Sequence, residues 1–183
     1  MIAMRVQWED IPPEGLEVAL EEVGDLPLKG PKGSLEEGMR LASPVRGRLS
    51  LKREKRGVVI KGDFRCTVFI RCARCLKEFE LPISEDFESL YLHIRYAPQE
   101  DEVELSAKDM EVGFLREETV EVEEILRERI WLSIPMKPLC KEDCRGLCPT
   151  CGKDLNEGDC GCPKEALDPR FAILKDLKLS LKG

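Results

Sequence analysis

Apolar and polar residues alternate along the middle of the chain in a pattern that predicts β-strands. From residue 58 to residue 72, every second position belongs to one apolar face, and most positions between them are charged. A period of two over this length indicates a strand with one buried face. Residues 45–52 alternate in the same way, R-E-K-R-G supplies a turn, and residues 79–96 are again strand-like. The apolar face over residues 58–72 contains Ile60, Gly62, Phe64, Cys66, Val68, Ile70 and Cys72.

Other segments depart from this alternation. The N-terminal runs M-R-V-Q-W and L-E-V-A-L-E-E-V predict two more strands, although the second run also fits a short helix, and the acidic residues 97–111 predict a loop. Helical spacing of apolar residues predicts a helix at about 120–134 that Pro135 ends. Asp168 and Pro169 favour the start of a last helix. The apolar faces of these helices contain Val122, Ile125, Leu126, Ile130 and Ile134, and then Phe171, Leu174 and Leu177.

We therefore expect an α+β fold with an antiparallel, partly barrel-like sheet, C-terminal helices and a small cysteine metal-knuckle insertion. The α+β body would span residues 1–135, with its strands in residues 1–96. The cysteine-rich knuckle would span residues 136–163, and a C-terminal helix within 164–183 would pack on the body. We find no internal repeat.

The cysteine content favours a metal over disulfides. Six of the nine cysteines lie within 23 residues that are rich in Gly, Pro, Asp and Lys, so a hydrophobic core cannot stabilise this segment. No apolar run is long enough to span a bilayer, and the acidic start is unlike a secretion signal. We expect a cytoplasmic protein with reduced thiols and a structural zinc ion. A reduced or disulfide-paired cluster and an iron–sulfur cluster are the alternatives.

Cys148 and Cys151 are the most evident metal ligands. They belong to C-P-T-C-G, in which a tight turn presents two thiolates to one metal. Six thiols for four positions leave two spare or permit a larger cluster. Catalytic zinc is not expected, because the single histidine, His93, lies in a strand-like run and the cluster has no H-x-E pattern. Spacing does not choose the other ligands among Cys140, Cys144, Cys160 and Cys162.

A second C-x-x-C, Cys72-Ala73-Arg74-Cys75, follows the long predicted strand. It fits a metal half-site or a redox pair. It also fits a structural role in which Cys72 continues the buried face and Cys75 closes a turn. No βαβ pattern surrounds it, which disfavours a thioredoxin-like site. We interpret Cys66 as a small core residue and His93 as a packing or surface residue.

Charge is distributed unevenly along the chain. Residues 40–77 carry twelve bases and two acids, a net charge of +10, whereas residues 78–128 carry seventeen acids and four bases, a net charge of −13. The basic block can contact phosphates, or it can pair with acidic residues on neighbouring strands. The high charge, with one Asn and two Gln, is typical of proteins from hot environments. Candidate RNA or partner contacts are Arg46, Arg48, Lys52, Arg53, Lys55, Arg56, Arg71 and Arg74.

Four blocks together resemble the YceD family, the large ribosomal RNA subunit accumulation proteins of bacteria and plastids, in its cysteine-bearing branch. The blocks are C-A-R-C-L-K-E-F-E-L-P-I, R-E-R-I-W-L-S-I-P-M-K-P-L-C, C-K-E-D-C-R-G-L-C-P-T-C-G-K-D-L-N and D-P-R-F-A-I-L-K-D-L. The positions that match the family pattern are Cys72, Arg74, Cys75, Leu76, Cys140, Cys144, Cys148, Cys151, Asn156, Asp168, Pro169, Arg170 and Phe171.

The resemblance implies a role in ribosomal RNA accumulation or large-subunit assembly. Some relatives lack the cysteine run, so the metal would stabilise the fold and not perform chemistry. No nucleophile–base pair, phosphate loop or dinucleotide fingerprint is present in the sequence. We expect a non-enzymatic factor that contacts ribosomal RNA, a large-subunit ribosomal protein or both, with no membrane and no small-molecule substrate. A zinc-supported, nuclease-like RNA-processing enzyme and a thiol redox switch are the alternatives.

Overall fold

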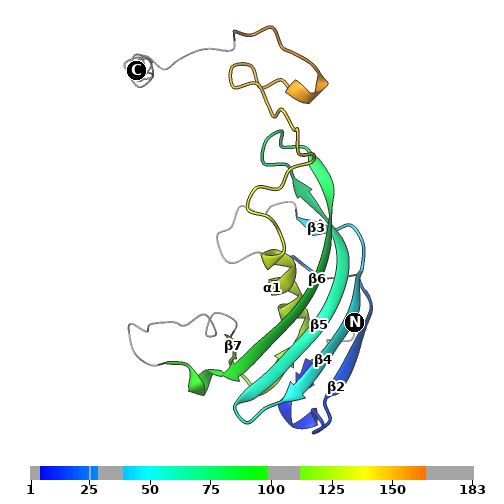
Figure 1. The fold of residues 1–183 in the computed structure, drawn as a ribbon, viewed down its shortest axis with the longest axis vertical. Helices are drawn as coiled ribbons and strands as arrows, with labels where there is room; N and C mark the ends of the chain where they lie inside the picture. Colours follow the sequence, from blue (N-terminus) through cyan, green and yellow to red (C-terminus); the bar gives the residue numbers. More distant parts are fainter. Residues whose placement is uncertain (1–4, 25, 29–38, 99–111, 164–183) are drawn as a thin grey trace, which may run out of the picture. The chain divides into compact units, whose positions relative to one another are not determined.

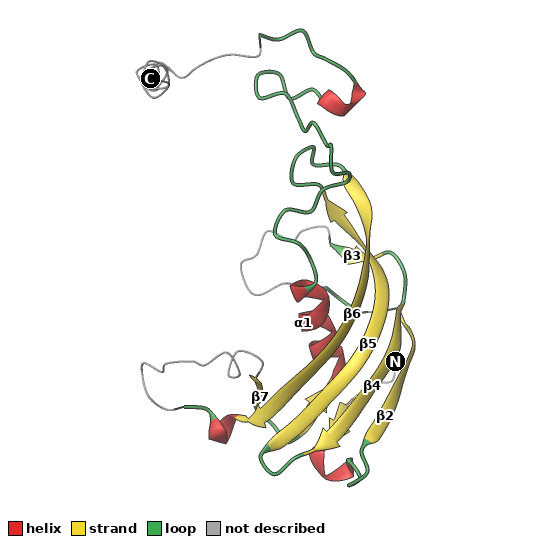
Figure 2. Cartoon of the chain, in the orientation of Figure 1, coloured by secondary structure: helices red, strands yellow, loops and turns green. Residues whose placement is uncertain are grey.

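The computed structural model describes residues 5–24, 26–28, 39–98 and 112–163. It divides into two compact units, residues 1–140 and residues 141–183. Strands dominate the first unit (Figures 1 and 2). They are β1 (Arg5–Gln7), β2 (Leu16–Val23), β3 (Arg40–Leu41), β4 (Val45–Arg53), β5 (Gly57–Arg71), β6 (Glu78–His93), β7 (Val112–Leu115) and β8 (Thr119–Glu121). The helix α1 spans Val122–Leu132, and 3-10 turns span Trp8–Asp10, Ile94–Tyr96 and Leu155–Glu157.

The main sheet has the order β2-β4-β5-β6-β7, and β3 pairs with β5 beyond the end of β4. All of these pairings are antiparallel except that of β6 with β7, which is parallel. The expected strands over residues 45–52, 58–72 and 79–96 correspond to β4, β5 and β6, and the helix expected at about 120–134 corresponds to α1. β5 and β6 form a long hairpin paired from Gly57↔Leu92 to Arg71↔Glu78.

The sheet is not closed into a barrel, so the partly barrel-like expectation is not confirmed. Closure needs a hydrogen-bonded partner for each edge strand and a consistent stagger around the sheet. Within the described ranges, β2 and β7 are the two ends of the strand order and do not pair with each other. The described residues contain one α-helix, and the last helix expected within residues 164–183 lies outside them.

The core lies between α1 and one face of the sheet. Even-numbered residues of β5 point into it: Ile60, Phe64 and Val68 have no exposed surface, as the alternation predicts. Helical spacing directs Val122, Ile125, Leu126 and Ile130 of α1 to the same core. Figure 1 shows α1 lying against one face of the β4–β5–β6 sheet.

Polar contacts also attach α1 to β6. Arg129 donates to the hydroxyl of Ser89, and its guanidinium lies 4.8 Å from the ring centre of Phe87. The hydroxyl of Ser133 donates to the carboxylate of Glu85. These contacts fix the C-terminal half of α1 on the sheet, and therefore fix where the following segment starts.

A separate two-stranded ladder joins the beginning of the first unit to the beginning of α1. β1 pairs antiparallel with β8 through Arg5↔Glu121, Val6↔Val120 and Gln7↔Thr119. The backbone N–H of Trp8 donates to the carbonyl of Glu118 at 2.8 Å. Strands separated by more than one hundred residues in sequence thus set the start of the helix. Within the described residues, no helix combines the length and apolar character that a membrane span requires.

Candidate metal centres and a charged sheet face

Two groups of four cysteines have ligand sulfurs that all lie within 4.8 Å of one another inside each group. The first group contains Cys72, Cys75, Cys140 and Cys144, and the second contains Cys148, Cys151, Cys160 and Cys162. Each group could hold a metal ion. The structure thus divides the six clustered cysteines between two groups, and brings the separate C-x-x-C into one of them.

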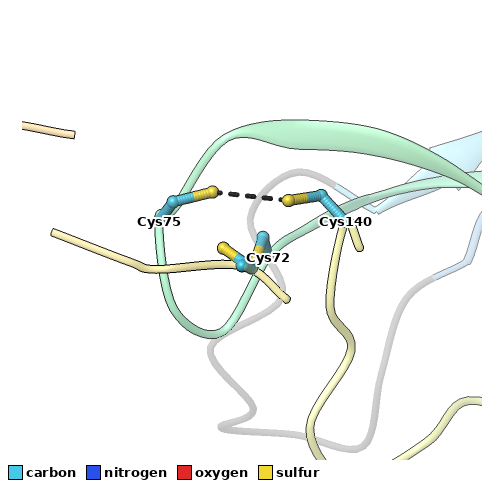
Figure 3. Close-up of side chains that lie close together, drawn as sticks. Cys72, Cys75 and Cys140 are labelled. Carbon is cyan, nitrogen blue, oxygen red and sulfur yellow. Dashed lines mark hydrogen bonds between the residues drawn. The ribbon is translucent and has the colours of Figure 1, made fainter. Parts of the chain in front are cut away.

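The first group forms at the tip of the β5–β6 hairpin. Cys72 and Cys75 follow β5, and Figure 3 shows their thiols beside that of Cys140. The sulfurs of Cys75 and Cys140 are 3.7 Å apart. The backbone N–H of Ala73 donates to the carbonyl of Pro138 at 2.8 Å. This bond holds the segment that precedes Cys140 against the turn.

The turn after Cys72 is closed by three hydrogen bonds. The N–H of Cys72 donates to Lys77 at 2.9 Å, and the N–H of Leu76 donates to the carbonyl of Cys72 at 3.0 Å. The N–H of Arg74 donates to the sulfur of Cys72 at 3.4 Å. Leu76 has a φ of 60° and is the one non-glycine residue with positive φ among the described residues.

The second group is built on a turn of the same kind. The N–H of Cys148 donates to Lys153 at 2.8 Å, and the N–H of Gly152 donates to the carbonyl of Cys148 at 2.9 Å. Gly152 has a φ of 74°, which glycine adopts without steric cost. Cys148 is buried, Cys151 is exposed, and Cys160 and Cys162 are half-buried.

Zinc fits the donor set and the spacing. Zinc–thiolate bonds of about 2.3 Å in a regular tetrahedron place sulfurs roughly 3.8 Å apart, close to the 3.7 Å between Cys75 and Cys140. A disulfide needs about 2.05 Å. Four thiolates are also the donor set of many structural zinc sites, and they leave no open position for a substrate.

Burial and nearby hydrogen-bond donors shift the pKa values of several thiols in the two groups. Burial raises the pKa of Cys72, but nearby donors, led by the Cys140, Cys75 and Arg74 backbones, outweigh it and lower the pKa to about 6. Backbone donation from Cys151 and Thr150 lowers the pKa of Cys148 to about 6. Hydrogen bonds with Cys151 and Cys160 raise the pKa of Cys162 to about 12. Each group therefore contains a readily formed thiolate, the form that binds metal.

Within the second unit, polar residues surround the thiol of Cys144. The side-chain amide of Asn156 donates to the sulfur of Cys144 at 3.4 Å and to Asp154 at 2.7 Å. Its carbonyl oxygen accepts from the backbone N–H of Arg145 at 2.9 Å. The guanidinium of Arg145 also forms an ion pair with Asp159. Asn156 thus orients a thiol through several directed hydrogen bonds, as outer residues of metal sites do.

The candidate RNA contacts occupy three places along the first unit. Arg46, Arg48 and Lys52 share the face of β4 opposite the core, and Arg71 ends β5 on the same face. Arg53 ends β4, Lys55 and Arg56 lie in the β4–β5 turn, and Arg74 lies in the cysteine turn. The two ends of β5 are roughly 45 Å apart for a strand of this length. The eight residues therefore do not form one compact patch.

The face of the sheet opposite the core, here called the outer face, carries rows of opposite charge. β4 contributes Arg46, Arg48 and Lys52, and β5 contributes Lys61 and Arg65, with Asp63 between them opposite Arg48. β6 contributes an acidic row of Glu80, Asp86 and Glu88. Arg46 and Arg65 occupy paired positions and line a shallow depression with Ser43, Thr67 and Ser84. Lys61 and Arg65 alternate in phase with Arg71, so the sequence pattern already places them on the polar face of this strand, although they are not among the candidate contacts.

Some basic residues pair internally, as the alternative interpretation of the basic block predicts. Arg40 makes two hydrogen bonds to Glu78, at 2.6 and 2.9 Å, and its guanidinium lies 4.1 Å from the ring centre of Phe69. This pairing raises the pKa of Arg40 and lowers that of Glu78. Lys61 forms an ion pair with Glu88 at 2.9 Å.

Cys66 and His93 take structural positions. Cys66 is 5% exposed, and burial raises the pKa of its thiol to about 11. The Nδ1 atom of His93 accepts from the N–H of Arg95 at 3.1 Å, and its ring stacks on Trp8. Neither residue belongs to the two cysteine groups.

Fold and site together define a sheet protein with two four-cysteine groups and a charged outer face. Residues 60–178 match the family described as large ribosomal RNA subunit accumulation protein YceD. The chain belongs to this family, which confirms the resemblance seen in its sequence.

Relatives come from bacteria and plants. An uncharacterized protein of Mycobacterium tuberculosis is 30% identical over 129 residues, which cover 70% of this chain and 59% of that protein. The uncharacterized protein YlbN of Bacillus subtilis is 29% identical over 151 residues, covering 78% of this chain and 79% of YlbN. The Arabidopsis thaliana large ribosomal RNA subunit accumulation protein YCED homolog 1, chloroplastic, is 25% identical, covering 74% of this chain and 49% of the plant protein. The chain spans about three-fifths of the length of the mycobacterial relatives. No solved structure matches the chain.

Proposed function

We propose that the protein is a non-enzymatic factor that supports the accumulation of large-subunit ribosomal RNA by binding RNA on its outer face. Family membership supports this choice of cellular process, because a plant relative carries that function in its name. The observation that carries the binding proposal is the exposed basic row on β4 and β5. A polyanion is attracted to such a surface through release of its counterions.

The position of the basic side chains on the outer face of the sheet favours a binding role for them. Arg48 and Arg65 are exposed and point away from the core, so they contribute nothing to its packing. Ser43, Thr67 and Ser84 around Arg65 offer hydroxyl groups that can donate to phosphate or ribose oxygens. An exposed sheet face with such side chains suits contacts to the sugar–phosphate backbone of a nucleic acid more than reading of its base sequence.

The proposed metal is structural and lies in the group of Cys148, Cys151, Cys160 and Cys162. A bound zinc ion supplies folding energy to a polar loop. The four thiols would hold the ion, and the N–H groups of Cys151 and Thr150 would stabilise the Cys148 thiolate. The binding role requires no reaction at this site.

Charge reversal on the outer face tests the RNA proposal. The double variant Arg48→Glu/Arg65→Glu should bind large-subunit ribosomal RNA fragments at least about tenfold more weakly, with a shallower dependence on salt. The matched control is Arg53→Glu/Arg56→Glu, which makes the same charge change in and beside the β4–β5 turn. The control should stay within about threefold of the wild-type affinity. Circular dichroism checks that both variants keep their strand content.

Equal losses in the two variants, or binding that does not depend on salt, would contradict a site on the outer face. The acidic row of β6 offers a different partner, a basic ribosomal protein. Capture of such a protein that is lost in Glu80→Lys/Asp86→Lys, with RNA binding unchanged in Arg48→Glu/Arg65→Glu, would replace RNA with protein as the partner.

A further inference from the structure

We propose that Cys72, Cys75 and Cys140, with Cys144 as the fourth ligand, bind a second zinc ion, so that the chain carries two structural metal ions. This site is distinct from the one proposed above at Cys148, Cys151, Cys160 and Cys162. It depends on the thiols alone and does not rest on RNA binding.

The first argument is that the two C-x-x-C turns have the same backbone. In C-A-R-C-L-K and C-P-T-C-G-K, the N–H of the first cysteine donates to the lysine carbonyl five residues later, at 2.9 and 2.8 Å. The fifth residue of each turn donates to the carbonyl of the first cysteine, at 3.0 and 2.9 Å. This turn aims two thiols at one point, and in the second group it does so toward two further cysteines.

The second argument is that the first turn keeps this backbone at a steric cost. Leu76 occupies the position of Gly152, and both have positive φ, 60° and 74°. A leucine in the left-handed region costs about 1–2 kcal/mol. The Leu76 side chain is 61% exposed, so packing does not offset that cost. Binding of a metal by Cys72 and Cys75 accounts for a turn that holds leucine in this conformation.

The third argument is the arrangement of the thiols. Cys140 comes from the segment after α1, and its sulfur lies 3.7 Å from that of Cys75, near the roughly 3.8 Å of a zinc tetrahedron. Figure 3 shows these two thiols pointing toward each other across the turn, with Cys72 beneath them. Cys144 follows Cys140 after three residues and completes the four sulfurs within 4.8 Å.

Burial makes the site suitable for a structural ion and not for a reactive one. Cys72 has no exposed surface, and Cys75 and Cys144 are 4% and 2% exposed. Buried thiolates need a cation and hydrogen-bond donors to offset lost hydration. Donors are present: the N–H of Arg74 points at Cys72, and the amide of Asn156 points at Cys144. A divalent zinc ion would supply the cation.

A second ion would fasten the segment after α1 to the tip of the β5–β6 hairpin. The hydrogen bond from Ala73 to Pro138 already joins these two parts. A metal between Cys75 and Cys140 would link residues 65 positions apart in sequence. The site would therefore set the path of the chain as it leaves α1.

Metal counting on the full chain tests the proposal. Native mass spectrometry and elemental analysis of the reduced, zinc-loaded protein should find two zinc ions per chain. Cys75→Ser and Cys151→Ser should each retain one ion, and the double variant should retain none. Cys144→Ser should lose the same ion as Cys75→Ser. Cys66→Ala is the control, because it removes a buried cysteine outside both groups and should retain two ions.

The outcomes separate the alternatives. One zinc ion in the wild-type chain, or two that both survive Cys75→Ser, overturns the second site. A mass that shows a disulfide in place of a second zinc also overturns it. A variant can lose metal simply because it misfolds, so the number of sites is also measured in the wild-type chain with cobalt in place of zinc. Two sites of four thiolates each should give twice the thiolate-to-cobalt absorption of one site. RNA binding plays no part in these measurements, so their failure is distinct from failure of the proposed function.

Discussion

The two C-x-x-C turns have the same backbone but very different support. The first, around Cys72, ends the longest hairpin of the sheet, and both of its cysteines are buried. The second, around Cys148, lies in residues 141–163, where regular pairing among the described residues consists of one bridge between Leu147 and Asp154. The first tolerates a leucine at positive φ, and the second has glycine there. A turn supported by both a sheet and the proposed metal can keep a leucine at positive φ, whereas a turn in a loop with little core has glycine there, which avoids the strain.

Metal removal should distinguish the loop around Cys148 from the sheet most strongly. Structural zinc contributes about 10–16 kcal/mol in small zinc-finger peptides, so the loop around Cys148 should lose its structure when a strong chelator is added. The amides of Cys148 and Gly152 should then exchange with solvent at least about a hundredfold faster, while Ile60 and Val68 of β5 keep their protection. Hydrogen exchange measured by NMR follows both regions in one sample.

Adding excess zinc after the chelator is the control, and it should restore slow exchange at Cys148. If the two amides stay protected after complete metal removal, the loop holds itself together without an ion. If the amides of β5 lose their protection as well, the sheet does not hold its structure independently of the metal, contrary to the comparison made above.

Single ligand substitutions should differ in their effect on the first unit. Cys75→Ser should lower its free energy of unfolding by about 2–4 kcal/mol, because the segment after α1 loses its attachment to the hairpin tip. Cys151→Ser should lower it by less than about 1 kcal/mol, because none of the ligands in its group lies in residues 1–140. Urea unfolding followed by the fluorescence of Trp8 and Trp131, which both lie in the first unit, gives both values. If both substitutions lowered the free energy of unfolding of the first unit equally, each cysteine group would not stabilise only its own surroundings.

Asn156 should matter for the group that contains Cys144. Asn156→Ala removes the donor to the Cys144 sulfur and the acceptor for Arg145, so zinc affinity of that group should fall about tenfold. Asn156→Asp keeps the shape but replaces the donor with an acceptor, and should weaken binding at least as much. Competition with a chromogenic chelator measures both. An unchanged affinity in Asn156→Asp would show that this donor does not tune the thiolate.

Exchanging the residues at positive φ should give the smallest effects, with opposite signs. Gly152→Leu should destabilise the second turn by about 1–2 kcal/mol, because leucine is strained at this positive φ. A steric clash does not contribute, since a Cβ added at Gly152 meets nothing within 4 Å. Leu76→Gly should stabilise the first unit by about 0.5–1 kcal/mol, because strain is relieved and little packing is lost. Thermal unfolding of the zinc-loaded chains measures both changes. A loss of stability in Leu76→Gly would mean that the exposed leucine packs against something.

Periodicity predicted the long elements and missed the short strands β3, β7 and β8. Alternation over fifteen residues is a strong signal, and β5 follows it, although Gly62 and Ile70 on the predicted buried face are only half-buried. β7 and β8 have four and three residues, too few to show a period, and the parallel pairing of β7 depends on tertiary packing. The antiparallel expectation was therefore wrong for one strand pair.

The sequence predicted that the cysteines bind a metal, but it did not predict which cysteines group together. Spacing identified Cys148 and Cys151, yet it could not join Cys72 and Cys75 to Cys140, because only the folded hairpin brings them together. One signal was available: C-x-x-C is followed by a lysine two residues later in both turns. Six residues are too short to register as a repeat. The basic block appeared as one surface because charge was counted along the chain, whereas strands alternate their faces and extend to distant ends.

The ladder between β1 and β8 has a consequence for how the chain folds as it is synthesised. The β4–β5–β6 meander joins neighbouring strands and can form as soon as residue 93 has emerged. β1 has to wait for residues 119–121, which at translation rates of about 5–20 residues per second takes on the order of ten seconds. During that interval the apolar side of the sheet lacks α1. The nascent chain is therefore exposed to chaperones and to wrong strand pairing until β1 pairs with β8.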